Sequence, residues 1–123
     1  MNKPPTILVI DDDDDLRETV CMLLMLAGYD VTAAANGREA LDLLESAEVP
    51  NLILLDLMMP LMDGWQFRAE QKKRAKLANL PVLLLTASRN LGKLPIDVDA
   101  KDILLKPFAS EDLLGAVRRH CAS

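Results

Sequence analysis

The chain has 123 residues, the size of one domain, and 50% of them are hydrophobic, which is enough for a single packed core. The net charge of −5 argues against direct nucleic-acid binding, which needs clustered lysine and arginine. No apolar run approaches the ~20 residues that span a bilayer, and no signal-peptide pattern is present. We therefore expect a cytoplasmic protein without membrane attachment.

The cysteines and the one strongly basic stretch do not indicate a ligand site. Cys21 and Cys121 have no CxxC spacing, so we interpret both as reduced thiols in apolar surroundings. The basic stretch QKKRAK at 71–76 is interpreted as the solvated face of a helix.

Five apolar runs have the length and composition of β-strands. In chain order they are TILVI (6–10), YDVTAA (29–34), NLILLD (51–56), PVLLLT (81–86) and the weaker DILLK (102–106). Their apolar residues are continuous rather than alternating, which is typical of strands buried on both faces. The runs therefore predict a parallel sheet.

Helical patterns lie between these runs. They begin after the aspartates at 11–15, after Asn36-Gly37, at Gly64, and at Ser110, a candidate N-cap. The first pattern ends at Gly28, where a helix C-terminus favours a left-handed residue. The segment 88–100 contains Gly92 and Pro95, so any helix there should be short or broken.

The order of these elements is a strand followed by a helix, repeated five times. Short right-handed crossovers then predict an α/β fold, a doubly wound five-stranded parallel sheet with helices on both faces. We expect one domain over 1–123 with its core at about 6–119. Because the last helix reaches the end of the sequence, we expect no output domain in this chain.

Polar side chains stand at the carboxyl ends of four predicted strands, where such sheets bind ligands. Asp11 and Asp12 follow the first strand, Asp56 ends the third, Thr86 ends the fourth and Lys106 ends the fifth. The three carboxylates and the ammonium carry a net charge of −2, which a divalent cation would neutralise. Hard oxygen ligands with room for water favour Mg²⁺ over zinc.

This combination of groups suits phosphoryl chemistry. A carboxylate beside Mg²⁺ and a lysine can act as a nucleophile toward a phosphoryl group. The cation and the ammonium would stabilise the charge on the phosphoryl oxygens in the transition state. The hydroxyl of Thr86 would then be available to bond a phosphoryl oxygen.

Five motifs carry a resemblance to a known family. ILVIDDDDDLR, GYDVTAAANGREAL, LILLDLMMPLMDG, PVLLLTA and LLKPF occur in this order with suitable spacing. Together they resemble the CheY-like receiver domain of response regulators in two-component signalling, over roughly residues 6 to 119. The resemblance implies a (βα)5 flavodoxin-like fold. It also implies that Asp56 accepts a phosphoryl group from a phosphohistidine on a sensor histidine kinase or histidine phosphotransfer protein.

The resemblance also assigns roles around the acceptor. It implies that Asp12, Asp56 and the backbone carbonyl of Met58 bind Mg²⁺ directly, and that Asp11 acts mainly through a metal-bound water. Lys106 would bond the phosphoryl group, and a cis peptide bond before Pro107 would aim it. Thr86 would move to contact the phosphoryl group as the switch. Asp13 to Asp15 are interpreted as capping and solvating the first helix.

The sequence departs from the family in the parts that transmit the signal. Ile103 occupies the position where most receivers carry an aromatic switch residue, so the usual threonine–aromatic coupling cannot operate in that form. Gly92 and Pro95 fall in the fourth helix. We therefore expect an unusual output surface or onward phosphoryl transfer, with an unknown downstream target and a monomer or weak dimer. His120, the only histidine, is misplaced for a phosphodonor, so the donor must be another molecule.

Three alternatives remain beside a stand-alone receiver that catalyses only its own phosphorylation and dephosphorylation. A Mg²⁺-dependent aspartyl-phosphate phosphatase acting on small molecules needs a second acid two residues after Asp56, where this chain has Met58. A phosphorylation-independent interaction module is disfavoured by the intact acids, Thr86 and Lys106. The chain is also compatible with a receiver taken from a longer regulator or hybrid kinase.

Overall fold

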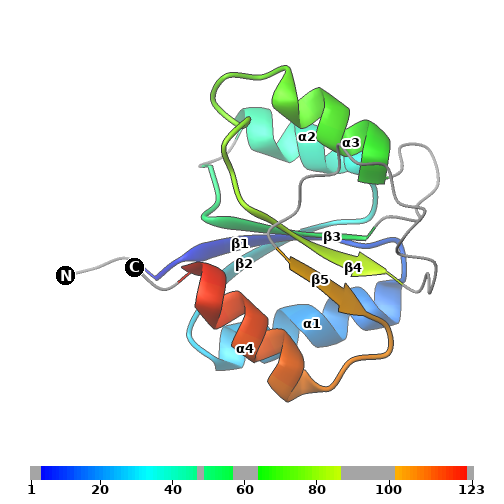
Figure 1. The fold of residues 1–123 in the computed structure, drawn as a ribbon, viewed down its shortest axis with the longest axis vertical. Coiled ribbons are helices and arrows are strands. Elements are labelled where there is room, and N and C mark those ends of the chain that lie inside the picture. Colours follow the sequence, from blue (N-terminus) through cyan, green and yellow to red (C-terminus); the bar gives the residue numbers. More distant parts are fainter. Residues whose placement is uncertain (1–3, 47–48, 57–63, 87–101, 122–123) are drawn as a thin grey trace.

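The computed structural model describes residues 4–46, 49–56, 64–86 and 102–121, and within them five strands and four helices follow one another along the chain (Figure 1). The elements are β1 (Thr6–Ile10), α1 (Asp14–Leu26), β2 (Asp30–Ala34), α2 (Gly37–Ser46), β3 (Leu52–Asp56), α3 (Gly64–Lys72), β4 (Val82–Thr86), β5 (Asp102–Leu105) and α4 (Ser110–Cys121). The segment predicted to hold a short or broken helix, with Gly92 and Pro95, lies outside the described residues. None of the described helices is long and apolar enough to cross a membrane.

The five strands form one parallel sheet in the order β2-β1-β3-β4-β5. The parallel, doubly wound sheet predicted from the continuous apolar runs is therefore confirmed. Ile10 at the end of β1 is level with Ala34 of β2 on one side and with Leu55 of β3 on the other. The chain thus turns to opposite sides of β1, and the carboxyl ends of β1 and β3 flank the point where strand order reverses.

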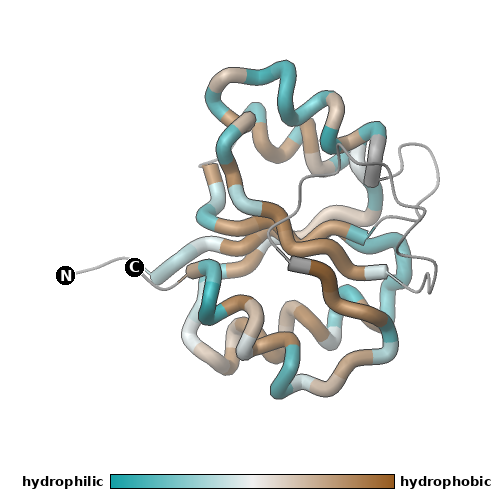
Figure 2. Tube along the Cα trace, viewed as in Figure 1, coloured by the Kyte–Doolittle hydropathy of each residue, from teal (hydrophilic) through white to brown (hydrophobic). Residues whose placement is uncertain are grey.

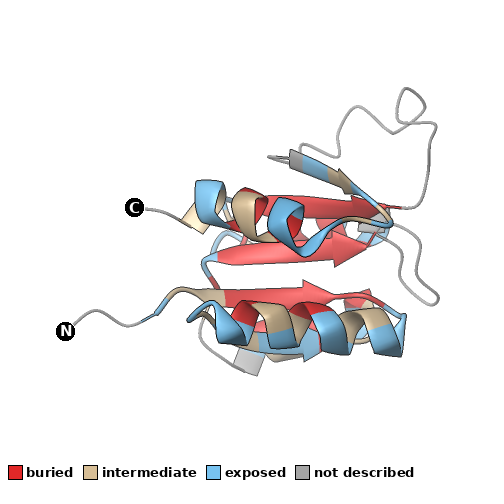
Figure 3. Ribbon diagram, turned by 90° about the horizontal axis from the view of Figure 1, so that it is seen from below, coloured by how far each residue is buried: buried red, intermediate tan, exposed pale blue. Residues whose placement is uncertain are grey.

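Helices cover both faces of the sheet, with α1 and α4 on one face and α2 and α3 on the other (Figure 1). Alternate residues of a strand point to opposite faces. Ile7 and Val9 accordingly join the core under α1 and α4, whereas Leu8 and Ile10 join the core under α2 and α3. The apolar sheet stands out in Figure 2, and the buried central strands in Figure 3. Burial on both faces explains why these strands read as unbroken apolar runs.

The two outer strands are less covered than the central ones. Among the described strands, β2 pairs only with β1, and most of its residues are exposed or partly exposed. Within the described sheet β5 pairs only with β4, and its residues Ile103 and Leu105 are 37% and 43% exposed. Ile103, at the position of the missing aromatic residue, therefore lies at the molecular surface on an outer strand.

Both ends of α1 are capped at the residues that the sequence indicated. Asp13 is the N-cap, and its carboxylate accepts a hydrogen bond from the N–H of Leu16 at 3.1 Å. At the other end Gly28 has a φ of 99°, and the N–H of Tyr29 donates to the carbonyl of Leu24 at 3.1 Å. This reversal needs a left-handed residue, which glycine adopts without steric penalty. The interpretation of Asp13 to Asp15 as a helix start is confirmed.

Replacing Asp13 with alanine should lower the free energy of unfolding by about 1 kcal/mol, because the N–H of Leu16 loses its acceptor. Urea denaturation without Mg²⁺ measures this change. Glu18→Ala, at an exposed position farther along α1, is the matched control and should change stability by less than about 0.5 kcal/mol. Equal losses in the two variants would contradict the capping role.

Two local predictions need correction. Ser110 is the first residue of α4 rather than its N-cap, because the N–H of Leu113 already donates to the carbonyl of Ala109 at 3.2 Å. The basic stretch 71–76 is not simply a solvated helix face, since α3 ends at Lys72 and the chain then turns. Gln71 is fully buried, and its amide donates to the carbonyl of Leu77 at 2.8 Å, which ties α3 to this turn.

Candidate functional site

Three carboxylates meet beyond the carboxyl ends of β1 and β3. Asp11 follows β1, Asp56 is the last residue of β3, and the register of the two strands places them side by side. One carboxylate oxygen from each of Asp11, Asp12 and Asp56 lies within 4.8 Å of the others. Asp11 and Asp56 are buried, with 1% and 3% exposure, whereas Asp12 is exposed. The cluster therefore has a buried floor and one open side.

Lys106 brings a positive charge to this cluster. The end of β5 lies beside Thr86 of β4, where the N–H of Lys106 donates to the Thr86 carbonyl at 2.8 Å. The Nζ atom donates to Oδ2 of Asp11 at 2.9 Å and lies 3.5 Å from Oδ2 of Asp56. Burial opposes the charge on Lys106, but the hydrogen bond to Asp11 and the charge of Asp56 outweigh it and raise the pKa of the amine. The lysine therefore remains an ammonium at neutral pH.

The structure also describes two of the remaining features that were predicted for the site. Thr86 is buried at the end of β4, and Asp56 is level with the residue just before it, so the two lie on adjacent strand ends. The Lys106–Pro107 peptide bond is cis, as the resemblance implied. Met58, expected to offer its backbone carbonyl, lies outside the described residues.

The donor set of the cluster fits a hard divalent cation. Its three carboxylates and one ammonium carry a net charge of −2, and their oxygen atoms are close enough to share one ion. Mg²⁺ prefers carboxylate oxygens and retains several waters, which the exposed side at Asp12 would admit. The residues therefore fit the cation that the sequence predicted.

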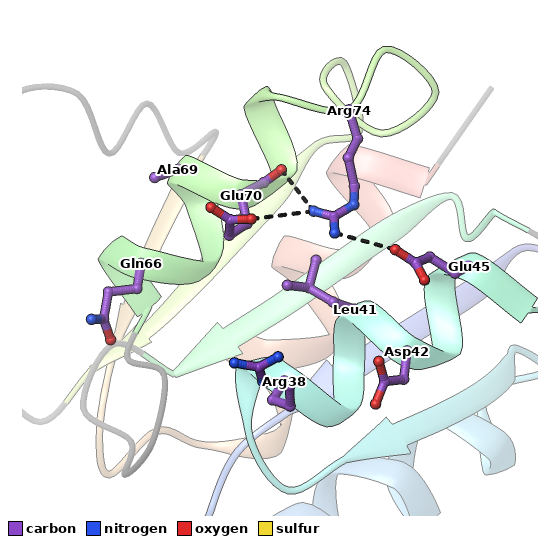
Figure 4. Close-up of a pocket in the computed structure, with 8 residues that line it drawn as sticks. All are labelled: Arg38, Leu41, Asp42, Glu45, Gln66, Ala69, Glu70 and Arg74. Atoms are coloured by element: carbon purple, nitrogen blue, oxygen red, sulfur yellow. Dashed lines mark hydrogen bonds and ion pairs between the residues drawn. The ribbon is translucent and has the colours of Figure 1, made fainter.

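The main hollows of the surface do not all belong to this site. One of about 370 Å³ is lined by Asp13, Leu16, Lys106, Pro107 and Phe108, directly beside the cluster. A larger one, of about 520 Å³, lies between α2 and α3 and is lined by none of the strand-end residues (Figure 4). Its charged side chains largely satisfy one another, as in the Arg74–Glu45 pair at 3.2 Å. The chemistry therefore places the site at the sheet edge and not in the larger hollow.

The comparison with known proteins agrees with this geometry. A family model described as the response regulator receiver domain matches residues 7–118. The chain belongs to this family. It is a receiver domain of the kind found in two-component response regulators, and such domains act with histidine kinases as signalling switches.

Individual relatives show how far this likeness extends. The response regulator MprA of Mycolicibacterium vanbaalenii is 41% identical over 117 residues, which are 94% of this chain but 49% of MprA. The chain thus spans about half the length of this relative. The chemotaxis protein CheY4 of Vibrio cholerae superposes with a TM-score of 0.88 at 33% identity, covering 96% of this receiver and 99% of CheY4.

A further solved structure bears on the metal. The response regulator TrrA of Thermotoga maritima, determined in complex with Mg²⁺ and BeF, superposes with a TM-score of 0.81 at 31% identity. The match covers 94% of this receiver and 97% of TrrA. A protein of the same fold therefore binds Mg²⁺ together with a beryllium fluoride.

One side chain near the cluster received no role from the sequence. Arg17 of α1 donates from Nη1 to the backbone carbonyl of Asp11 at 2.8 Å, and from Nη2 to Oδ1 of Asp14 at 2.6 Å. The pairing with Asp14 follows the i, i+3 spacing of a helix and was open to prediction. The contact with Asp11 was not, because it depends on how the chain turns from β1 into α1.

Proposed function

We propose that this receiver domain accepts a phosphoryl group on Asp56 with the help of Mg²⁺, and thereby switches its conformation for signalling. The observation that carries the proposal is the placement of the Lys106 ammonium 2.9 Å from Asp11 and 3.5 Å from Asp56. A lysine between two buried acids beside a third, open acid is suited to holding a phosphoryl group next to a carboxylate nucleophile.

The protein would assist the transfer mainly by placing the reacting groups next to each other. An ionised Asp56 attacks the phosphorus of a phosphohistidine, a new O–P bond forms and the P–N bond breaks. The electron pair of that bond stays on the imidazole nitrogen of the donor. Because the carboxylate needs no deprotonation, no general base is required. The donor would be a sensor histidine kinase or a histidine phosphotransfer protein.

The surrounding residues divide the remaining tasks. Asp12 and Asp56 would hold Mg²⁺ directly together with the carbonyl of Met58, and Asp11 would contact it through water. Bound Mg²⁺ supplies positive charge to the phosphoryl oxygens. Lys106 offsets the charge of the acids before transfer and bonds the phosphoryl group after it. Thr86, at the end of the adjacent strand, would donate its hydroxyl to a phosphoryl oxygen and so report phosphorylation to β4 and β5.

The proposal extends to the whole chain as a single receiver domain that catalyses its own phosphorylation and its own slow dephosphorylation. The net charge of −5 favours a protein partner over direct contact with nucleic acid. We also propose that it works in the cytoplasm as a monomer or weak dimer.

Intact-mass measurement after incubation with acetyl phosphate and Mg²⁺ tests the proposal. The parent protein should gain one phosphoryl group, and the gain should disappear with EDTA and in Asp56→Asn. Asp30→Asn, which removes an exposed acid at the start of β2, is the control and should be labelled like the parent. Labelling that persists in Asp56→Asn would contradict Asp56 as the acceptor. Failure to bind beryllofluoride as well as to gain mass would favour the phosphorylation-independent interaction module.

A further inference from the structure

The guanidinium of Arg17 links the first turns of α1 to the backbone of the acidic cluster. Nη1 donates to the carbonyl of Asp11 at 2.8 Å, and Nη2 donates to Asp14 at 2.6 Å. The Arg17 side chain is only 19% exposed and its bond to the Asp11 carbonyl is partly buried, whereas the Asp14 side chain is 78% exposed and its bond to Arg17 lies at the surface. Within the described part of the chain, no other group donates to the Asp11 carbonyl.

This carbonyl belongs to the peptide group that joins Asp11 to Asp12. A peptide group is planar, so holding its oxygen fixes the direction in which the chain continues to Asp12. Asp11 itself has further anchors, since its N–H donates to Ala34 at 3.2 Å and its carboxylate accepts from Lys106 at 2.9 Å.

The side chain of Asp12 has no such anchor in the described part of the chain. It is exposed, and among the described residues none donates a hydrogen bond to its carboxylate. Its orientation therefore depends on the backbone on either side of it. Arg17 holds the peptide before Asp12, and the N–H of Asp13, which donates to Oδ1 of Asp11 at 3.0 Å, holds the peptide after it.

We propose that Arg17 is a positioning residue for the divalent cation. By holding the Asp11–Asp12 peptide, it directs the Asp12 carboxylate toward Asp11 and Asp56, within 4.8 Å of their oxygens. Arg17 acts through these residues and is not a ligand. The inference rests on the proposed function, because that function places a divalent cation at the three acids.

A positioning role and a purely electrostatic role of Arg17 predict opposite changes in Mg²⁺ affinity when its side chain is removed. Its positive charge repels a cation, so charge alone predicts that removal tightens Mg²⁺ binding. Loss of an indirect contact that orients a metal ligand instead weakens binding, by roughly 10–100-fold. The sign of the change in affinity therefore separates the two roles.

Calorimetric titration of the full chain with Mg²⁺, well below its unfolding temperature, measures this sign. Arg17→Gln should raise the dissociation constant by about 10–100-fold. Arg118→Gln is the control. It removes the same charge from an exposed side chain in the last turn of α4, at the edge of the sheet opposite the strands' carboxyl ends (Figure 1), so its dissociation constant should stay within about twofold of the parent's. The Mg²⁺ concentration for half-maximal labelling by acetyl phosphate should rise in Arg17→Gln, with the rate at saturating Mg²⁺ close to that of the parent.

Binding in Arg17→Gln that is as tight as in the parent, or tighter, would overturn the inference. If Arg17→Gln does not fold by circular dichroism, Arg17→Lys decides the matter. It keeps the charge but not the two-pronged geometry, so weaker Mg²⁺ binding would support positioning and unchanged binding would overturn it. A parent protein that neither binds Mg²⁺ nor is labelled by acetyl phosphate would contradict both the proposed function and this inference. A parent that binds Mg²⁺ and is labelled, together with an Arg17 variant that binds Mg²⁺ equally well, would contradict this inference and leave the proposed function standing.

Discussion

Lys106→Met should lower both the free energy of unfolding and the rate of phosphorylation. Without the ammonium, the carboxylates of Asp11 and Asp56 lose a positive charge that lies 2.9 and 3.5 Å away. Removing one partner of a buried ion pair costs ~3–5 kcal/mol, and because the lysine side chain is 17% exposed we expect the lower end, about 3 kcal/mol. The rate of labelling by acetyl phosphate should fall about 10²–10³-fold, as when one charge-stabilising donor is removed.

Urea denaturation without Mg²⁺ measures the stability change, and Lys73→Met is its control. Lys73 is 72% exposed and pairs with Glu70 at the surface, so its removal should change stability by less than about 1 kcal/mol. Mg²⁺ should then stabilise Lys106→Met more than the parent, because the site has lost a competing positive charge. A variant as stable as the parent, with no greater response to Mg²⁺, would show that Lys106 does not offset the charge of the acids.

The sheet and the strand-end residues could be predicted because both follow from strong, local signals. Strands buried on both faces leave unbroken apolar runs, and β1, β3 and β4 are of this kind. Parallel strands also bring their carboxyl ends to one edge. Asp11, Asp56 and Lys106 could therefore be grouped although they are far apart in the sequence.

The contacts that depend on the path of the chain could not be predicted. Gln71 looked like part of a solvated basic stretch, but its amide is buried and donates to the carbonyls of Leu77 and Leu80. Those bonds arise only because the chain turns back after α3. The contact of Arg17 with the Asp11 carbonyl has the same origin, at the turn from β1 into α1. Local composition carries no signal for either.

The five consecutive aspartates allow one substitution to be compared in two settings. Asp12→Asn should raise the free energy of unfolding without Mg²⁺ by roughly 0.5–1 kcal/mol, because it removes one of three like charges within 4.8 Å of one another. The same change should weaken Mg²⁺ binding by more than about 100-fold, beyond the range of an indirect contact. Chemical denaturation and calorimetric titration measure the two effects.

Asp15→Asn should act in the opposite direction on stability. Asp15 lies in the first turn of α1, where the positive end of the helix dipole favours an anion, so its neutralisation should lower stability by about 0.3–1 kcal/mol. Its effect on Mg²⁺ binding should be small, since Asp15 is not one of the clustered acids. A stability change of the same sign in both variants would mean that the run acts as one block of charge. Opposite signs would mean that Asp12 is retained for cation binding at the expense of stability, while Asp15 serves the helix.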